Sequence, residues 1–274
     1  MPLTLMYITN NPAVASIAEK NGVQRIWIDL ETLGKEERQH RMNTVKSHHT
    51  IGDIRHVRSV LTTSELLVRV NPLHPGSATE IDRVIDAGAD LVMLPMWKTP
   101  GEVNEFLRMV GGRAKTVLLL ETKEAAECVD EVLTAGGFDE IHIGLNDLHL
   151  SYGLSFMFEL LSDGTVEMLC CKFRKAGVPY GFGGVARIGS GLLPAERIVM
   201  EHYRLGSTRA ILSRSFCNTE AVGDLGEIGR IFRENMRILR EFEASMPEKT
   251  AADFENNRAQ IRQIVATITG EIRR

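Results

Sequence analysis

The chain has 274 residues and lacks any stretch of about 18 consecutive apolar residues, so we expect no transmembrane helix. It also lacks a basic excess: the net charge of −4 and the pI of about 6.1 argue against nucleic acid and anionic membranes as partners. The four cysteines show no CxxC spacing, and we interpret them as reduced thiols of a cytoplasmic protein. The N-terminus lacks the charged start and apolar stretch of a signal peptide, so we interpret it as mature sequence.

A glycine-rich nucleotide-binding turn after an early strand is also missing, which argues against the main alternative, a doubly wound open sheet. The chain contains instead a series of short apolar, β-rich runs: 3–9, 25–31, 65–71, 91–96, 116–122, 140–146, 178–184 and 209–215. Several are nearly all apolar, as expected of parallel strands that are covered on both faces. We therefore predict an α/β fold in which residues 1–274 form a single (β/α)8 TIM barrel.

Amphipathic segments separate most of these runs. Thr99 followed by Pro100 predicts the start of a helix, and the glycines at 136 and 137 predict the end of the next one. Residues 220–274 predict additional C-terminal helices. The last of them carries an apolar stripe made of Phe254, Ile261, Ile264, Val265 and Ile268. We expect this stripe to cover either the barrel bottom or a second subunit.

Two carboxylates, Glu121 and Asp147, each follow an apolar run and lie 26 residues apart, about one strand–helix unit. Because the carboxyl ends of neighbouring parallel strands meet at one rim of a barrel, we expect these two side chains to converge there. Carboxylate oxygens are the ligands that hard divalent cations prefer. The sequence therefore predicts a cation site at this rim.

Other polar residues stand at predicted strand ends, among them Asp29, Glu31, Asn71 and Asn146. Arg69 interrupts the apolar run LLVRVN, so it has to point into a site or find a buried partner. Arginine is also well suited to grip a carboxylate through two parallel hydrogen bonds. The alternative interpretation is a salt-bridge network that only plugs the barrel top.

A glycine-rich stretch, GFGGVARIGSG, follows the seventh predicted strand and includes Arg187, while Arg214 lies at the end of the eighth. Loops after the last two strands are the usual phosphate site of such barrels. A substrate with a phosphate or a second carboxylate is therefore one hypothesis, and a purely steric need for glycine is the other.

Three segments carry a resemblance to a known family: LVRVNPLHPGSATEIDRVIDAGADLVMLPMWKTPGEV, LLLETKEAAECVDEV and FDEIHIGLNDLHLSYG. They resemble the HpcH/HpaI family of metal-dependent pyruvate aldolases and citrate lyase β subunits, over roughly residues 20–217. The resemblance implies that Glu121 and Asp147 bind Mg²⁺ or Mn²⁺ and that Arg69 contacts the keto acid. It also implies a homo-oligomer, a trimer or hexamer. We predict these substrate-binding residues: Asn71, Gly144, Asn146, Arg187 and Arg214.

The chain departs from the family pattern at two positions. Thr32 stands where the aldolases carry a histidine that acts as general base, and Leu119 stands where they carry a glutamine. Asp29 and Glu31 keep their acidic character, so we predict catalytic roles for both together with Arg69. A histidine of the loop after the second strand would replace the missing imidazole; its candidates are His40, His48 and His49, of which we prefer His48.

The resemblance and these residues predict a class II aldolase that cleaves or forms 4-hydroxy-2-oxo acids through a metal-stabilised pyruvate enolate, with an aldehyde as the other partner. A citrate-lyase-like or condensing enzyme acting on oxaloacetate, phosphoenolpyruvate or an acyl thioester is the first alternative. A sensor that binds a 2-oxo acid without turning it over is the second, because the histidine and glutamine are replaced.

Overall fold

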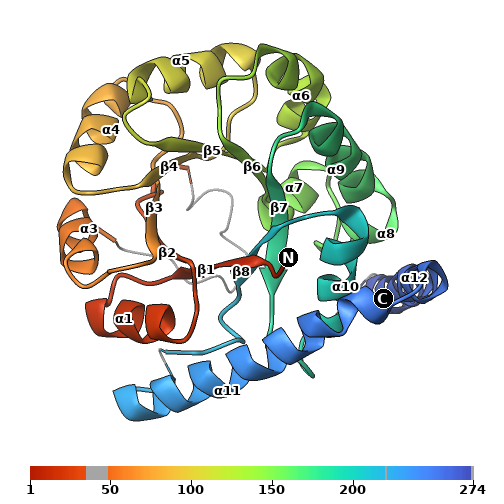
Figure 1. Ribbon diagram of the computed structural model, residues 1–274. Helices are drawn as coiled ribbons and strands as arrows, with labels where there is room; N and C mark the ends of the chain where they lie inside the picture. The colour runs from red at the N-terminus through yellow and green to blue at the C-terminus, as the bar shows by residue number, and fades with distance from the viewer. Residues whose placement is uncertain (35–48, 220, 273–274) are drawn as a thin grey trace.

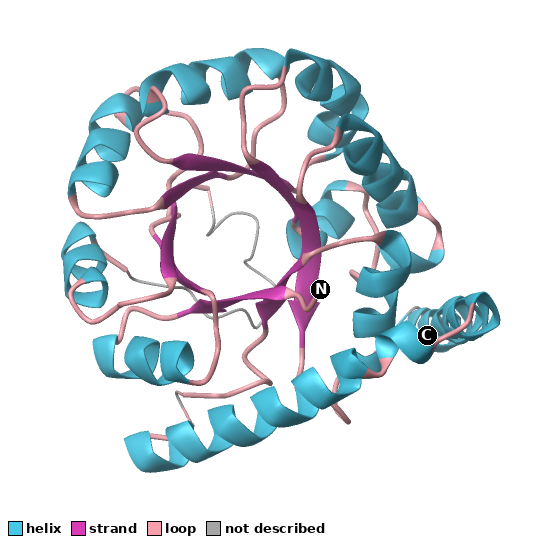
Figure 2. Cartoon of the chain, in the orientation of Figure 1, coloured by secondary structure: helices cyan, strands magenta, loops and turns pink. Residues whose placement is uncertain are grey.

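The computed structural model describes residues 1–34, 49–219 and 221–272, and the predicted catalytic residue His48 and the other candidate His40 lie outside them. Within this part, parallel strands β1 to β8 pair in chain order and close into a barrel, and helices surround it (Figures 1 and 2). The predicted TIM barrel with additional C-terminal helices is therefore confirmed. The strands are β1 Thr4–Ile8, β2 Arg25–Asp29, β3 Glu65–Arg69, β4 Leu91–Leu94, β5 Lys115–Leu120, β6 Glu140–Ile143, β7 Tyr180–Val185 and β8 Arg209–Leu212.

The strands end one to three residues before most of the predicted runs do, for example at Arg69 instead of residue 71. The predicted runs include the first residues after the strands, many of them polar, so the sequence pattern overestimates strand length at this rim. The described helices are α1 Pro12–Lys20, α3 Ile51–Arg58, α4 Ser77–Asp86, α5 Pro100–Val110, α6 Lys123–Ala135, α7 Leu145–Ser151, α8 Glu159–Ser162, α9 Thr165–Ala176, α10 Ala195–Leu205, α11 Leu225–Ala244 and α12 Ala251–Ile272.

The predicted helix signals operate in the structure. Thr99 caps α5 in a capping box with Glu102, and Pro100 occupies the first turn, where its missing N–H costs nothing. Gly136 follows the last residue of α6 with a φ of 66°, a conformation that favours glycine. None of the described helices is both long and apolar enough to cross a bilayer.

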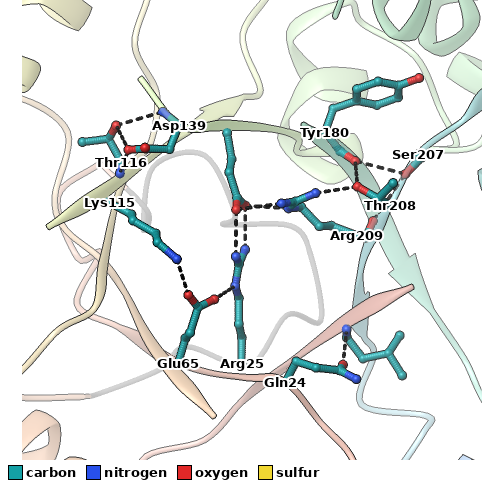
Figure 3. A network of polar contacts seen from close by, with 12 residues as sticks. Gln24, Arg25, Glu65, Lys115, Thr116, Asp139, Tyr180, Ser207, Thr208 and Arg209 are labelled. Atoms are coloured by element: carbon teal, nitrogen blue, oxygen red, sulfur yellow. Dashed lines mark hydrogen bonds and ion pairs between the residues drawn. The ribbon is translucent and has the colours of Figure 1, made fainter. Parts of the chain in front are cut away.

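The barrel interior has a charged end and an apolar middle. At the N-terminal strand ends, Glu140 accepts hydrogen bonds from both Arg25 and Arg209, and Glu65 joins Arg25 to Lys115; Figure 3 shows this network. Above it lies a cluster of inward-facing side chains, Met6, Trp27, Leu67, Leu91, Met93, Val117 and Leu119. The middle is therefore packed solid, which leaves the C-terminal end for a cavity.

The two C-terminal helices pack on the outside of the barrel. α11 lies along α1, and its Phe232 packs edge to face on Tyr7 of β1, with 4.9 Å between the ring centres. α12 packs against α10 and α8 at the edge of the helix ring, and it buries Ile261 and Val265 (Figure 1). The apolar stripe predicted for this helix thus covers other helices of the same chain instead of the barrel bottom.

Candidate active site

A cavity of about 760 Å³ lies at the C-terminal ends of the strands. Residues at or after the C-terminal ends of β1, β2, β3, β5, β6, β7 and β8 contribute to its wall, as expected for a barrel whose active site lies at this face. Its polar and charged wall residues include Thr9, Asn10, Asn11, Asp29, His49, Arg69, Glu121, Asn146, Asp147, Ser213, Arg214, Asn218 and Thr219.

Arg69, the last residue of β3, is fixed on three sides. Its Nε and Nη2 both donate to the carboxylate of Asp29 at 2.9 Å, and its Nη1 lies 3.1 Å from Glu31. The guanidinium carbon lies 5.4 Å from the ring centre of Trp27, a cation–π distance. Burial disfavours the charge, but Asp29 and Glu31 outweigh this effect and raise the pKa of Arg69 above its ordinary range. The structure therefore holds a permanent cation at the cavity wall.

Glu121 directly follows β5 and is 2% exposed. Its Oε1 accepts a hydrogen bond from the backbone N–H of Met96 at 3.1 Å. Met96 has a φ of 55°, a left-handed conformation that costs a non-glycine residue about 1 kcal/mol or more. Backbone strain at the end of β4 therefore aims a donor at this carboxylate.

Burial raises the pKa of Glu121 well above its ordinary 4.5; Arg69 opposes this effect, and Asp147 and Glu31 add to it. Gly144 permits the close approach of β6 to this side chain, because a Cβ there would lie 2.8 Å from Glu121 Cβ and Oε2. Burial and neighbouring carboxylates disfavour the ionised form of Glu121, and a bound cation would stabilise that form.

Asp147 lies in the first turn of α7, the helix that begins directly after β6, and it lines the cavity together with Glu121. The two predicted metal ligands are thus brought to one cavity, and the charge of Asp147 helps to raise the pKa of Glu121. Among the described residues, no group of three or more His, Cys, Asp or Glu side chains is arranged around a common point for a metal. A cation at this place would rely on two carboxylates and on oxygens from water or a ligand.

His49 contributes to the cavity wall, and its Nδ1 accepts the backbone N–H of Asp29 at 2.9 Å. Because a backbone N–H is always a donor, Nδ1 carries no proton in this arrangement, so the ring is neutral with its proton on Nε2. The ring braces Asp29, and it can donate from Nε2 but not accept there. No spacing rule distinguishes His49 from its neighbour His48; only the fold does.

The other predicted substrate-binding residues are divided. Gly144, Asn146 and Arg214 line the cavity. Arg187 is exposed and is not among the described residues that line it. Asn71 also lies away from the described cavity wall, with its side-chain amide turned to the chain after β2. The roles of all five remain predictions, and the structure gives positional support to three.

Two residues of the site carry no motif signal. Trp27 reaches the cavity from β2, two residues before Asp29, so the two-residue period of a strand places both on the inner face. That alternation was visible in RIWID and identifies Trp27 in retrospect. Met96 has no comparable signal, because its backbone angle follows from the packing of the finished rim.

Comparisons with known proteins identify the family and the fold of the chain. A family model described as HpcH/HpaI aldolase/citrate lyase matches residues 3–159. The fold resembles the crystal structure of an HpcH/HpaI aldolase from Desulfitobacterium hafniense, with a TM-score of 0.61 and 17% identity over 81% of this chain and 91% of the other. It also resembles an HpcH/HpaI aldolase/citrate lyase family protein from Burkholderia cenocepacia, with a TM-score of 0.62 and 16% identity over 83% and 94%.

No protein in the curated set matches the sequence. The structural matches show the fold, and the family model covers more than half of the 274 residues. The chain belongs to the HpcH/HpaI aldolase/citrate lyase family.

Proposed function

We propose that the chain is a metal-dependent carbon–carbon lyase, an aldolase that cleaves or forms 4-hydroxy-2-oxo acids with pyruvate as the keto acid. The observation that carries this proposal is the charge balance of the cavity wall. Among the described wall residues, the three acids Asp29, Glu121 and Asp147 face two cations, the largely buried Arg69 and the exposed Arg214. A divalent cation would balance this excess of negative charge. Membership of an aldolase and lyase family supports the same conclusion.

Glu121 and Asp147 are the residues that would hold Mg²⁺ or Mn²⁺. A bound cation of this kind would supply a Lewis acid that draws electron density from the keto oxygen of the substrate. The strained Met96 N–H fixes one oxygen of Glu121, which leaves Oε2 directed elsewhere. Glu121 directly follows β5 and Asp147 lies in the first turn of α7, so both side chains are carried by regular elements of the barrel rim.

Arg69 binds the carboxylate end of the keto acid and stabilises negative charge that develops on its enolate. Asp29 and Glu31 prevent the guanidinium from moving, and Trp27 covers its flat face. In the cleavage direction the 4-hydroxyl group loses its proton, the bond between carbons 3 and 4 breaks, and the proton returns to carbon 3 of the enolate. We assign this transfer to Asp29, directly or through a water, because Asp29 lines the cavity.

His49 supports this assignment indirectly. A base at its Nε2 would need the other tautomer, and the ring would then lose its hydrogen bond from Asp29 N–H. We therefore propose that His49 orients Asp29. Thr32 cannot orient Asp29 in this way, because its backbone N–H and its hydroxyl group both face Asn71.

The test is exchange of the pyruvate methyl protons in heavy water with added Mg²⁺, followed by NMR. We expect wild-type protein to exchange these protons and the Glu121→Gln variant to lose exchange. A screen of aldehydes with pyruvate then identifies the product. Absence of both exchange and product in the wild type would exclude the aldolase, and binding of pyruvate without exchange would favour a sensor.

A further inference from the structure

The amide of Asn71 holds the chain that leaves β2. Its Oδ1 accepts hydrogen bonds from the backbone N–H groups of Thr32 at 2.9 Å and Leu33 at 3.0 Å. Its Nδ2 donates to Glu80 Oε1 at 2.8 Å. Each polar atom of the side chain thus has a partner within the protein, which leaves the amide little capacity to bind a ligand.

Glu80 of α4 determines which way this amide points. Its Oε1 also receives the backbone N–H of Asn71 at 3.2 Å, and its Oε2 lies 3.0 Å from His74 Nε2. Because a carboxylate only accepts, the NH₂ group of Asn71 has to face Glu80 and the carbonyl oxygen has to face Thr32. The group His74, Glu80 and Asn71 therefore forms a chain of contacts that ends on the turn after β2.

This turn contains Glu31, one of the acids that hold Arg69. Ladder pairing between β2 and β3 ends at Asp29 and Arg69, and one more backbone bond follows, from Leu30 N–H to Arg69 O at 2.9 Å. Beyond that point the Asn71 side chain continues the connection between the two strand ends. Glu31 lies between these two attachments, is 1% exposed, and lies 3.1 Å from Arg69 Nη1.

We propose that Asn71 is a positioning residue that acts through Glu31 on Arg69, with Glu80 and His74 fixing the orientation of its amide. The expected effect on pyruvate affinity rests on the proposed function. The expected effect on the geometry of Arg69 does not. It assigns Asn71 a place behind the cavity wall instead of in contact with substrate.

Calorimetric titration with pyruvate in the presence of Mg²⁺ tests the functional part. We expect Asn71→Ala to weaken pyruvate binding about 10-fold, because one set of hydrogen bonds to the turn is lost. Binding of Mg²⁺ alone should change less than about twofold, since Asn71 does not reach Glu121 or Asp147. Asn71→Asp is almost the same size, cannot donate to Glu80, and should weaken pyruvate in the same direction.

Glu19 offers a matched control. Its carboxylate accepts the backbone N–H groups of Thr62, Thr63 and Ser64, so it braces a turn at the opposite end of the barrel in the same way. Glu19→Ala should lower the unfolding temperature and leave pyruvate affinity unchanged. Equal loss of pyruvate affinity in Glu19→Ala and in Asn71→Ala would overturn the proposal, because the loss would then follow from a general decrease in fold stability.

A double-mutant cycle with Glu31→Gln separates positioning from mere stability. If Asn71 acts through Glu31, Asn71→Ala should weaken pyruvate much less in the Glu31→Gln background than in the wild type. Additive effects would overturn the proposal.

The Nε–H resonance of Arg69, observed in protein with ¹⁵N-labelled arginine, needs no turnover. It should shift or broaden in Asn71→Ala and stay in place in Glu19→Ala. Should wild-type protein fail to bind pyruvate, the proposed function fails, and this resonance still decides the inference. An unchanged resonance in Asn71→Ala would overturn it.

Discussion

Asp29 and Arg69 face each other across the last pair of the β2–β3 ladder and join through two parallel hydrogen bonds of 2.9 Å. Such a fork matches guanidinium to carboxylate and cannot be made by a lysine. The pair lies at the cavity wall, and Glu31 and Trp27 contact the guanidinium on two further sides. The cavity thus presents a cation whose position depends on several neighbours at once.

Arg69→Lys should reduce kcat/KM for cleavage of a 4-hydroxy-2-oxo acid by about 100-fold, equal to about 2.7 kcal/mol of transition-state stabilisation. Lysine keeps the charge but offers one ammonium group where Asp29 and Glu31 need a planar fork. Steady-state kinetics with metal in excess measures the loss. Arg187→Lys, at an exposed position off the cavity wall, serves as the control and should retain activity. An active Arg69→Lys would contradict the role proposed for the fork.

Glu121→Gln should weaken Mn²⁺ binding at least about 100-fold while the metal-free protein remains as stable as the wild type or becomes more stable. The folded pKa of Glu121 lies above its unfolded value of 4.5, so its contribution to stability is present below pH 4.5 and is lost as pH rises through the folded pKa. In Glu121→Gln the free energy of unfolding should not show this decrease with rising pH. Manganese EPR measures binding, and unfolding at several pH values measures the slope. Undiminished Mn²⁺ binding would remove Glu121 from the site.

His49→Asn should preserve pyruvate proton exchange within about threefold, whereas His49→Ala should reduce it about 10-fold or more. The asparagine Oδ1 can take the place of Nδ1 as acceptor for Asp29 N–H, and alanine cannot. Exchange rates by NMR distinguish the two variants. If both variants lose exchange to the same extent, the ring itself carries the proton.

Glu140→Gln should destabilise the fold by about 3–5 kcal/mol, because Arg25 and Arg209 would lose a buried counter-ion. Burial alone would raise the pKa of Glu140, but its arginine partners lower that pKa to about 2. This stabilisation is complete above pH 4.5 and is lost as pH falls towards 2. Urea unfolding of wild type and variant at pH 7 and pH 3 should show a smaller difference at pH 3.

Burial lowers the pKa of His142 to about 4 and that of His202, stacked on Phe182 at 3.8 Å, to about 3. Both values lie below the unfolded 6.5, so their contribution to stability is present above pH 6.5 and is lost as pH falls through the folded values. The unfolding temperature should therefore decline below pH 6.5. His142→Leu should flatten part of this decline, and an unchanged slope would show that His142 titrates normally.

The sequence predicted the barrel and the convergence of Glu121 and Asp147 because both follow from strand period and strand–helix spacing. It did not predict on which side of the rim Asn71 lies, since side-chain alternation applies only while the strand continues and β3 ends at Arg69. Nor did it separate His49 from His48, because the loop that places them has no period to read. The backbone angle of Met96 is likewise a product of tertiary packing.

The charged network around Glu140 lies at the end of the barrel opposite the cavity. Closure of the sheet is therefore secured by residues that take no part in ligand recognition. Substitutions at the C-terminal rim can alter the chemistry without weakening the charged network at the N-terminal end. Variants of this chain can therefore acquire new substrates through changes in the loops alone. The separation of the stabilising network from the ligand site makes the scaffold a suitable starting point for laboratory evolution.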